Sequence, residues 1–308
     1  MPATVRGRRS FLQLLGATAA GLPFAHPAAA QTLPATHSID PGPVGVTMFD
    51  ESLGLVSGPG NVVVLKGPSS ALLVNGGPSD VSVSVTTRVD FLFNTDWHPE
   101  HTGLNLAVAG MGGQILAHEF TKQYLSIDRY VEWRNKMYKA LPAKALPTKT
   151  FTKAGSMMFG GQTIEYAPLG QAHTDGDIYV FFRDANVLVV GDMMTVGKYP
   201  IADYTSGGWL GGLVTATKTL LDLTTAETRI VPGDGPVQRR ADLQALYDML
   251  SASRDAFVKM MRQGMSADEM VAAGATKAFD ARWGNPELFV KTSYRSLWLH
   301  VREVGGIV

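Results

Sequence analysis

Hydrophobic residues in the first half of the chain come in short runs that are separated by turn-forming residues. Runs of this kind, rich in Val, Leu and Phe, predict β-strands. They cover residues 53–56, 61–66, 71–75 and 89–93, and Gly76-Gly77-Pro78 marks the end of the third run. Further strands are expected at 114–117, at several places between 156 and 190, and at 228–231.

Hydrophobic residues in the last quarter of the chain follow a different period. They recur every three or four residues, which predicts helices with one apolar face: Leu243, Leu246, Leu250, Phe257, Met260 and Met261. Shorter helices are expected at 104–111 and 213–223, and a polar, aromatic-rich helix at 120–141.

Composition narrows the class of protein. The chain has 308 residues, 45% of them hydrophobic, which suffices for one large or two ordinary domains with a substantial core. The formal net charge is zero, so there is no electrostatic sign of a nucleic-acid partner. The absence of cysteine excludes disulfides, thiolate metal ligands and a cysteine nucleophile.

The first thirty residues have the features of an export signal. Arg8-Arg9-Ser10-Phe11-Leu12-Gln13 resembles a twin-arginine signal, an apolar run follows at 14–22, and Ala28-Ala29-Ala30 offers a cleavage site. The apolar run is too short to span a bilayer, so stable membrane insertion is not expected. We predict a signal peptide at 1–30 and a periplasmic or secreted mature chain.

Candidate metal ligands are concentrated after the predicted strand 89–93. Asp96, His98, Glu100 and His101 lie within six residues of one another. Asp96 and His98 point to the same side of an extended segment, and Glu100 and His101 follow in a turn that can present them to the same point. Four ligand-type side chains at a strand-to-helix junction indicate a metal site.

Two later residues could complete such a site. His173 is expected in a turn between strands, and Asp192 follows the run 187–190. His118 follows another predicted strand but lies outside this pattern, and we interpret it as structural.

The stretch 94–105 resembles the metallo-β-lactamase superfamily, whose signature is His-x-His-x-Asp-His between Asn-Thr and Thr-Gly-x-Asn. The flanks match, whereas Asp96 stands for the first His and Glu100 for the Asp; Asp234 likewise stands for the His of Pro-Gly-His-Gly. The resemblance implies a four-layer αβ/βα sandwich with two mixed β-sheets flanked by helices. It also implies one domain over 31–308, with a helical insertion at about 119–142 and C-terminal helices at about 238–304. Asn75 stands where the family commonly has a supporting Asp.

The resemblance also implies a set of metal ligands. Asp96, His98 and His173 would form one half of the site, Glu100, His101 and Asp234 the other, and Asp192 would bridge them. Two divalent ions would activate water for attack on an ester, lactone, amide or phosphoester of a small-molecule substrate. We expect Glu100 and Asp192 to take part in catalysis.

The altered ligands change the charge of the predicted site. The predicted ligand shell has four carboxylates and three neutral imidazoles, so two divalent ions would bring its net charge to zero. Zinc is implied by the family, whereas the carboxylates favour harder ions such as Mn²⁺, and Fe is also compatible with them. Two alternatives to a hydrolase remain open: a non-hydrolytic metalloprotein of the di-iron redox type, and a metal-poor relative that binds a ligand without catalysis.

Overall fold

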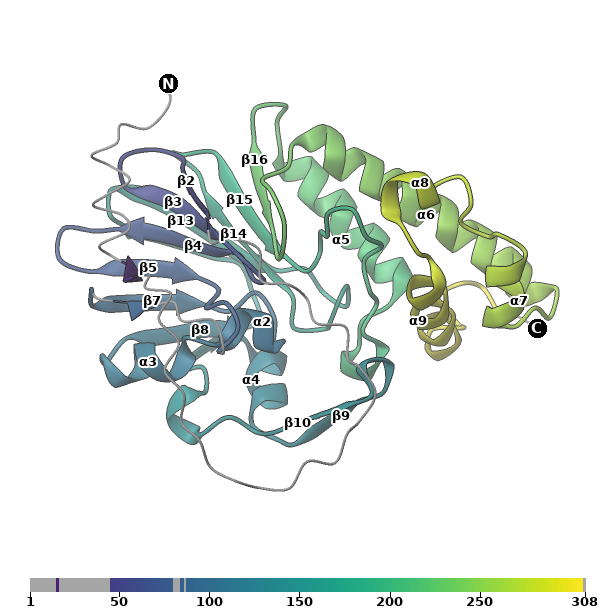
Figure 1. The fold of residues 1–308 in the computed structure, drawn as a ribbon, viewed down its shortest axis with the longest axis horizontal. Coiled ribbons are helices and arrows are strands. Elements are labelled where there is room, and N and C mark those ends of the chain that lie inside the picture. The colour runs from purple at the N-terminus through teal and green to yellow at the C-terminus, as the bar shows by residue number, and fades with distance from the viewer. Residues whose placement is uncertain (1–14, 17–44, 80–83, 86, 307–308) are drawn as a thin grey trace.

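Seven strands from the first half of the chain form one mixed sheet in the order β11-β8-β7-β5-β4-β3-β2 (Figure 1). The computed structural model describes residues 15–16, 45–79, 84–85 and 87–306. The strands β2 to β5 pair antiparallel, and β5, β7, β8 and β11 pair parallel. Their bounds are β2 Gly45–Met48, β3 Leu53–Ser57, β4 Val62–Lys66, β5 Ala71–Val74, β7 Val89–Phe93, β8 Gln114–His118 and β11 Lys149–Phe151.

Five strands from the middle of the chain form the second sheet, in the order β12-β13-β14-β15-β16. They are β12 Gly155–Phe159, β13 Gln162–Pro168, β14 Ile178–Phe182, β15 Val187–Gly191 and β16 Arg229–Pro232, and only β15 and β16 pair parallel. The two sheets share a core in which the rings of Phe93 and Tyr166 lie 5.0 Å apart. The strands β5, β14 and β15 are buried on both faces, which explains their continuous hydrophobic runs.

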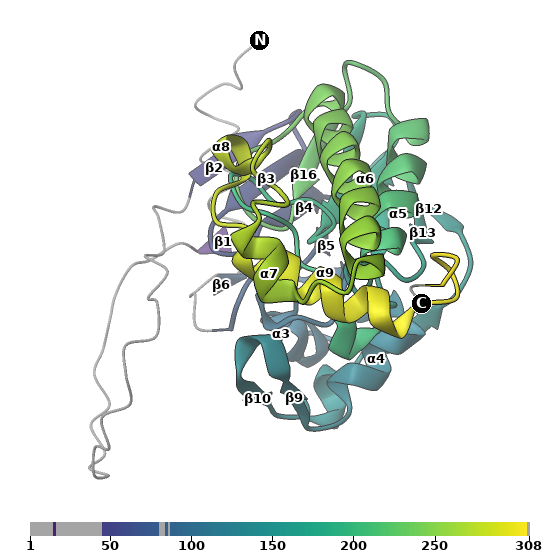
Figure 2. The same cartoon turned by 90° about the vertical axis from the view of Figure 1, so that its right-hand side faces the viewer.

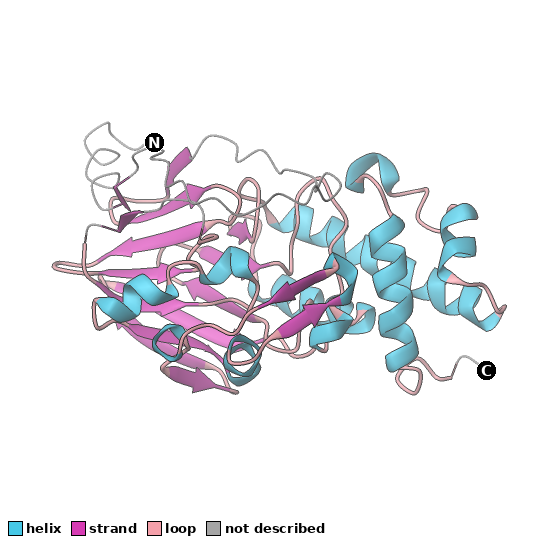
Figure 3. Ribbon diagram, turned by 60° about the horizontal axis from the view of Figure 1, so that its bottom comes forward, coloured by secondary structure: helices cyan, strands magenta, loops and turns pink. Residues whose placement is uncertain are grey.

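Helices cover the outer faces of the two sheets. The short helix α3 (Asn105–Gly110) packs on the first sheet through Val108. The longer helices α5 (Leu210–Leu223), α6 (Arg240–Arg262) and α9 (Glu287–Leu299) share a core with the second sheet, and α7 (Ala267–Ala272) and α8 (Asp280–Trp283) complete this side (Figure 2). Figure 3 shows the strands lying together with helices outside them. The predicted α/β architecture of two mixed sheets flanked by helices is confirmed.

The prediction of a helix over the whole of 119–142 is wrong after Leu125. The helix α4 (Glu119–Leu125) is followed by a hairpin of β9 (Arg129–Val131) and β10 (Lys136–Tyr138), joined through the 3₁₀ turn η1 (Glu132–Arg134). Asn135 takes a left-handed conformation (φ 46°), which reverses the chain. A hairpin lets aromatic residues pack around Trp97 in a small separate core, which one straight helix could not do.

The remaining described elements are short. They are β1 (Leu15–Gly16), which pairs with β6 (Ser84–Val85), the helix α2 (Pro99–Thr102), and the 3₁₀ turns η2 (Ala143–Ala145) and η3 (Tyr204–Ser206). The twin-arginine motif and the cleavage site of the predicted signal at 1–30 lie outside the described residues. No helix in the described ranges is both long enough and apolar enough to cross a membrane.

Asn75 connects the end of β5 to the loop that follows β7. Its side chain is buried, and its Oδ1 accepts hydrogen bonds from the Thr95 amide (2.9 Å) and the Thr95 hydroxyl (3.0 Å). Its backbone is left-handed (φ 64°), a conformation that Asn tolerates better than most residues. Asn75 therefore supports the start of the candidate metal loop without contributing a charge.

We expect Asn75→Ala to lower the free energy of unfolding by about 3 kcal/mol, because it removes the acceptor of two buried donors and strains the backbone. The matched control is Asn135→Ala, which changes another left-handed Asn in an exposed hairpin and should cost about 1 kcal/mol. Urea unfolding of both variants measures the difference. Equal losses would contradict a supporting role for the Asn75 side chain.

Candidate metal centre

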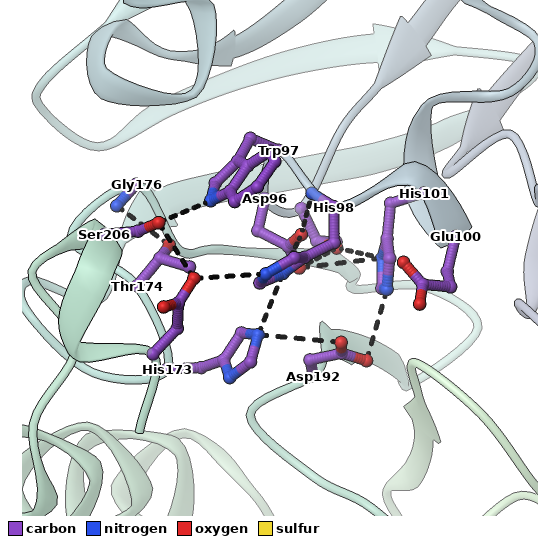
Figure 4. Close-up of polar contacts among 12 residues, drawn as sticks. Asp96, Trp97, His98, Glu100, His101, His173, Thr174, Gly176, Asp192 and Ser206 are labelled. Carbon is purple, nitrogen blue, oxygen red and sulfur yellow. Dashed lines mark hydrogen bonds and ion pairs between the residues drawn. The ribbon is translucent and has the colours of Figure 1, made fainter. Parts of the chain in front are cut away.

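The candidate ligands lie where strands of both sheets end. Asp96 and His98 follow β7, His173 lies in the loop between β13 and β14, and Asp192 follows β15. Figure 4 shows these side chains pointing toward one another. The sandwich therefore brings together segments that are far apart in the chain, at an edge where α/β proteins commonly bind ligands.

A pair of amides fixes the loop after β7. Asn94 and Asn105 are both fully buried and donate to each other's side-chain oxygens at 2.9 and 3.0 Å. Asn94 also donates to the carbonyl of His101 (3.1 Å), which holds the one-turn helix α2 against the strand end. These contacts explain why an Asn stands at each end of the stretch 94–105.

Four donor groups converge in this loop region. Asp96, His98, His173 and Asp192 each offer an atom within 4.8 Å of the others. His98 Nδ1 lies 3.0 Å from His173 Nε2 and 3.3 Å from Asp96 Oδ1, and His173 Nε2 lies 3.6 Å from Asp192 Oδ2. Donors that share a tetrahedral ion at about 2.0–2.2 Å lie roughly 3.3–3.6 Å apart. The distances of 3.3 and 3.6 Å fall in this range and the two imidazole nitrogens lie closer together, so the four residues could hold a divalent metal ion after a small adjustment of the rings.

The outward nitrogens of both histidines are held by the protein. His173 Nδ1 lies 2.7 Å from the carbonyl oxygen of Ile201, and His98 Nε2 lies 3.2 Å from Asp203 Oδ2. An acceptor at the outer nitrogen draws the proton there and leaves the inner nitrogen free to bind a metal. A hydrogen bond thus orients the His173 ring, and an ion-pair contact with Asp203 orients the His98 ring, so that the other nitrogen of each ring lies within the group of candidate ligands.

Both carboxylate oxygens of Asp203 in turn accept hydrogen bonds from neighbouring residues. Its Oδ1 accepts from the Trp133 indole (2.9 Å) and from the amide and hydroxyl of Thr205, and its Oδ2 accepts from the Ser206 hydroxyl (2.8 Å). Trp133 belongs to the inserted hairpin, so the insertion helps to position a candidate ligand. Sequence reasoning missed Asp203, because no motif or strand end marks it.

The charges of the cluster favour cations. Burial lowers the pKa of His98, but the contacts with Asp203 and Asp96 outweigh this and raise the pKa to about 10. Burial likewise opposes the charge of His101, yet the carboxylates of Asp96 and Asp192 raise the pKa of His101 to about 9. Burial and the neighbouring charge of His98 lower the pKa of His173. A divalent ion would satisfy the same carboxylates in place of these protons.

His101 borders this group of four residues but is not one of them. Its Nε2 lies 3.2 Å from Asp192 Oδ1, and its Nδ1 lies 2.8 Å from the Thr95 hydroxyl. Asp192 therefore lies between His101 and His173.

Glu100 and Asp234 are not brought into the group of four. Glu100 Oε1 accepts a hydrogen bond from Arg134 Nη1 (2.5 Å), and Asp234 Oδ2 accepts one from Lys198 Nζ (2.8 Å). The second Glu100 oxygen is buried without a hydrogen-bond partner among the described residues. Neither Arg134 nor Lys198 belongs to the ligand pattern that the sequence contains.

The turn that carries Asp234 is nevertheless packed against the centre. The Asn61 side chain donates to the carbonyls of Pro232 (2.9 Å) and Gly235 (2.8 Å). A Cβ atom at Gly233 would lie 2.1 Å from Asp192 Oδ1, so only glycine allows this close approach.

His118 has the structural role that the sequence analysis assigned to it. It precedes α4, and its Nδ1 accepts a hydrogen bond from the Phe120 amide (3.3 Å).

A pocket of about 430 Å³ opens beside the metal centre. Glu100, His101, His173, Asp192 and Asp234 lie along one part of its lining. The rest of the lining combines apolar and basic residues from the insertion, the loop after β15 and the start of α9, among them Trp133, Arg134, Lys198, Tyr199, Leu288 and Phe289. This volume is suited to a small molecule.

We expect Asp203→Asn to weaken Zn²⁺ binding about 10- to 100-fold, because an amide nitrogen facing His98 would move the ring proton to Nδ1, the inward donor. Asp175→Asn is the control, because Asp175 accepts from Tyr124 in the same region without contacting the four donors. Calorimetric titration with Zn²⁺ measures both affinities. Unchanged affinity in Asp203→Asn would rule out this positioning role.

Comparisons with known proteins agree with the fold. A family model described as "Metallo-beta-lactamase superfamily" matches residues 55–248. No curated protein sequence matches the chain significantly.

Solved structures share the architecture at low sequence identity. The metallo-β-lactamase from Pontibacter korlensis is 18% identical with a TM-score of 0.55, over 68% of this chain and 99% of that one. The inverting sec-alkylsulfatase Pisa1 from Pseudomonas sp. is 12% identical with a TM-score of 0.64, over 82% of this chain and 50% of that one. The DIM-1 metallo-β-lactamase is 14% identical with a TM-score of 0.54, over 69% of this chain and 98% of that one. Because the family model matches more than half of its length, the chain belongs to the metallo-β-lactamase superfamily.

Proposed function

We propose that this protein is a metal-dependent hydrolase of small molecules, with Asp96, His98, His173 and Asp192 holding a divalent ion at the pocket. The observation that supports this most is the convergence of two imidazole nitrogens and two carboxylates at ligand spacing, with the outward nitrogens anchored. Zn²⁺ suits the two imidazoles, whereas the two carboxylates also accommodate Mn²⁺ or Fe²⁺.

A divalent ion in this position would supply the usual chemistry of metallohydrolases, lowering the pKa of water and polarising the bond under attack. The protein supports this chemistry with its own groups. Asp192 connects the group of four to His101, which keeps a carboxylate directed at the reacting centre.

Glu100 is the group that we propose as proton acceptor. It lines the pocket, and its Oε2 carries no hydrogen bond from another described residue. Burial raises the pKa of Glu100, but the charge of Arg134 outweighs this and lowers it, so the carboxylate is ionised at neutral pH. Arg134 also fixes the carboxylate through Oε1, which leaves the buried Oε2 without a hydrogen bond from another described residue.

The pocket lining indicates a substrate with an apolar part. Trp133, Tyr199, Leu288 and Phe289 contribute aromatic and aliphatic surface to the pocket that Glu100, His101, His173 and Asp192 also line. The solved structures similar to this chain include a lactamase and a sulfatase, so the fold admits more than one scissile bond. We propose an ester, lactone, amide or phosphoester, in a periplasmic or secreted protein if the twin-arginine motif directs its export.

The proposed function is tested by metal analysis and hydrolysis of the same preparations. The purified full chain should carry Zn, Mn or Fe and hydrolyse a member of a panel of aryl esters, lactones, β-lactams, phosphoesters and alkyl sulfates. His173→Ala should lose the metal and at least 100-fold of the activity, because it removes a donor and its anchored ring. His118→Ala is the control and should keep both. A protein that cannot be loaded with metal would refute the proposal, and absorbance changes with Fe²⁺ and air would indicate redox chemistry instead.

Metal affinity should rise with pH. The pKa of His98 is raised to about 10, so the ring carries a proton at neutral pH that must leave before Nδ1 can bind an ion. Below that pKa, one proton released per ion makes the affinity rise about tenfold per pH unit. Calorimetry with Zn²⁺ at pH 6.5, 7.5 and 8.5, in buffers of different ionisation enthalpy, counts the released protons. A pH-independent affinity would exclude His98 as a ligand.

A further inference from the structure

The two carboxylates assigned to the second half of the predicted metal site each form an ion pair with a basic side chain. Glu100 is paired with Arg134, which comes from the inserted hairpin. Asp234 is paired with Lys198, which comes from the loop after β15. Arg134 and Lys198 come from different segments. Each of them contacts one of the two candidate carboxylates that do not belong to the group of four.

Arg134 is built into the protein rather than lying free on its surface. Its side chain is only 20% exposed, and its guanidinium carbon lies 4.6 Å from the ring centre of Trp133. Its Nη1 also donates to the hydroxyl of Tyr138 (3.2 Å). Arg134 is therefore held in place by the same hairpin that supports Asp203 through Trp133.

Lys198 is more exposed, with 55% of its side chain accessible, and Asp234 is 43% accessible. An exposed pair of this kind contributes little stability. Its backbone is nevertheless fixed, because the Thr195 hydroxyl donates to the Lys198 carbonyl (2.8 Å), and the turn of Asp234 is held by Asn61. The ammonium and the carboxylate thus meet at the pocket, which both residues line.

The balance of charge then differs between the two halves of the site. In the first half, Asp96 and Asp192 face two imidazoles that are neutral when they act as ligands, and one divalent ion balances the two carboxylates. In the second half, Glu100 and Asp234 are already balanced by Arg134 and Lys198. A second ion would add two positive charges there, close to the guanidinium of Arg134 and the ammonium of Lys198, and would be repelled by both.

We propose that this chain holds one divalent ion, and that Arg134 and Lys198 supply the positive charge that a second ion would otherwise bring to Glu100 and Asp234. This inference rests on the metal binding of the proposed function. It revises the two-ion site that the sequence predicts, and it assigns a role to two bases that the ligand pattern does not contain.

The test is metal stoichiometry, measured by elemental analysis and Zn²⁺ titration of the full chain. The wild-type protein should bind one equivalent, and Glu100→Gln with Asp234→Asn should leave that equivalent in place. Arg134→Met with Lys198→Met frees both carboxylates and should raise the stoichiometry to two. The control, Arg183→Met with Lys218→Met, breaks the ion pairs with Glu165 and Asp222 and should stay at one.

Each outcome separates this inference from the proposed function. Two equivalents in the wild-type protein, falling to one in Glu100→Gln with Asp234→Asn, would overturn the single-ion site but leave the hydrolase possible. A single equivalent in a folded Arg134→Met, Lys198→Met variant would show that these cations do not keep out a second ion, which would also overturn the inference. No metal in any preparation would instead refute the proposed function. Circular dichroism establishes that each variant is folded.

Discussion

The candidate metal centre depends on the ion-pair contact between His98 Nε2 and Asp203 Oδ2, which lie 3.2 Å apart. His98 is fully buried, and without an acceptor at its outer nitrogen the ring could turn or carry its proton on the inner one. Asp203 can hold the ring only because Trp133, Thr205 and Ser206 occupy its other lone pairs. One buried carboxylate therefore connects the inserted hairpin, the loop before α5 and the loop after β7. The packing of these segments around Trp97 therefore helps to position His98, and it also stabilises the fold.

The insertion contributes to the centre in two ways. Through Trp133 it positions Asp203, and through Arg134 it neutralises Glu100. The two residues are neighbours in η1, and the guanidinium packs over the indole. A change in the hairpin would therefore alter ligand orientation and pocket charge together. This connects an element outside the two sheets to the chemistry at their edge.

Replacing histidines by carboxylates in a metal site raises the question of how the added negative charge is balanced. In this protein the two added acids, Asp96 and Asp234, lie in different surroundings. Asp96 lies among the four converging donors, where an ion can balance it, whereas Asp234 lies beside Lys198. Glu100, which stands for an Asp of the family pattern, likewise lies beside a protein cation, Arg134. Unpaired carboxylates in a partly buried pocket would repel one another and take up protons, so each needs a positive partner. The altered ligand pattern and the two bases are thus parts of the same electrostatic arrangement.

The sequence by itself determined the parts of the structure that depend on local order. Strands and helices could be predicted because burial on a sheet or on one helix face imposes a period on neighbouring residues. The stretch 94–105 could also be predicted from local order, because its candidate ligands and its two Asn residues lie within twelve consecutive residues. The later residues His173 and Asp192 were named through the order of the family pattern, and the structure brings both to Asp96 and His98. Only the tertiary structure decided the rest: the hairpin in place of a helix after Leu125, the support from Asp203, and the pairing of Glu100 and Asp234 with bases. Those features depend on which side chains meet across the fold, and such contacts leave no period or motif along the chain.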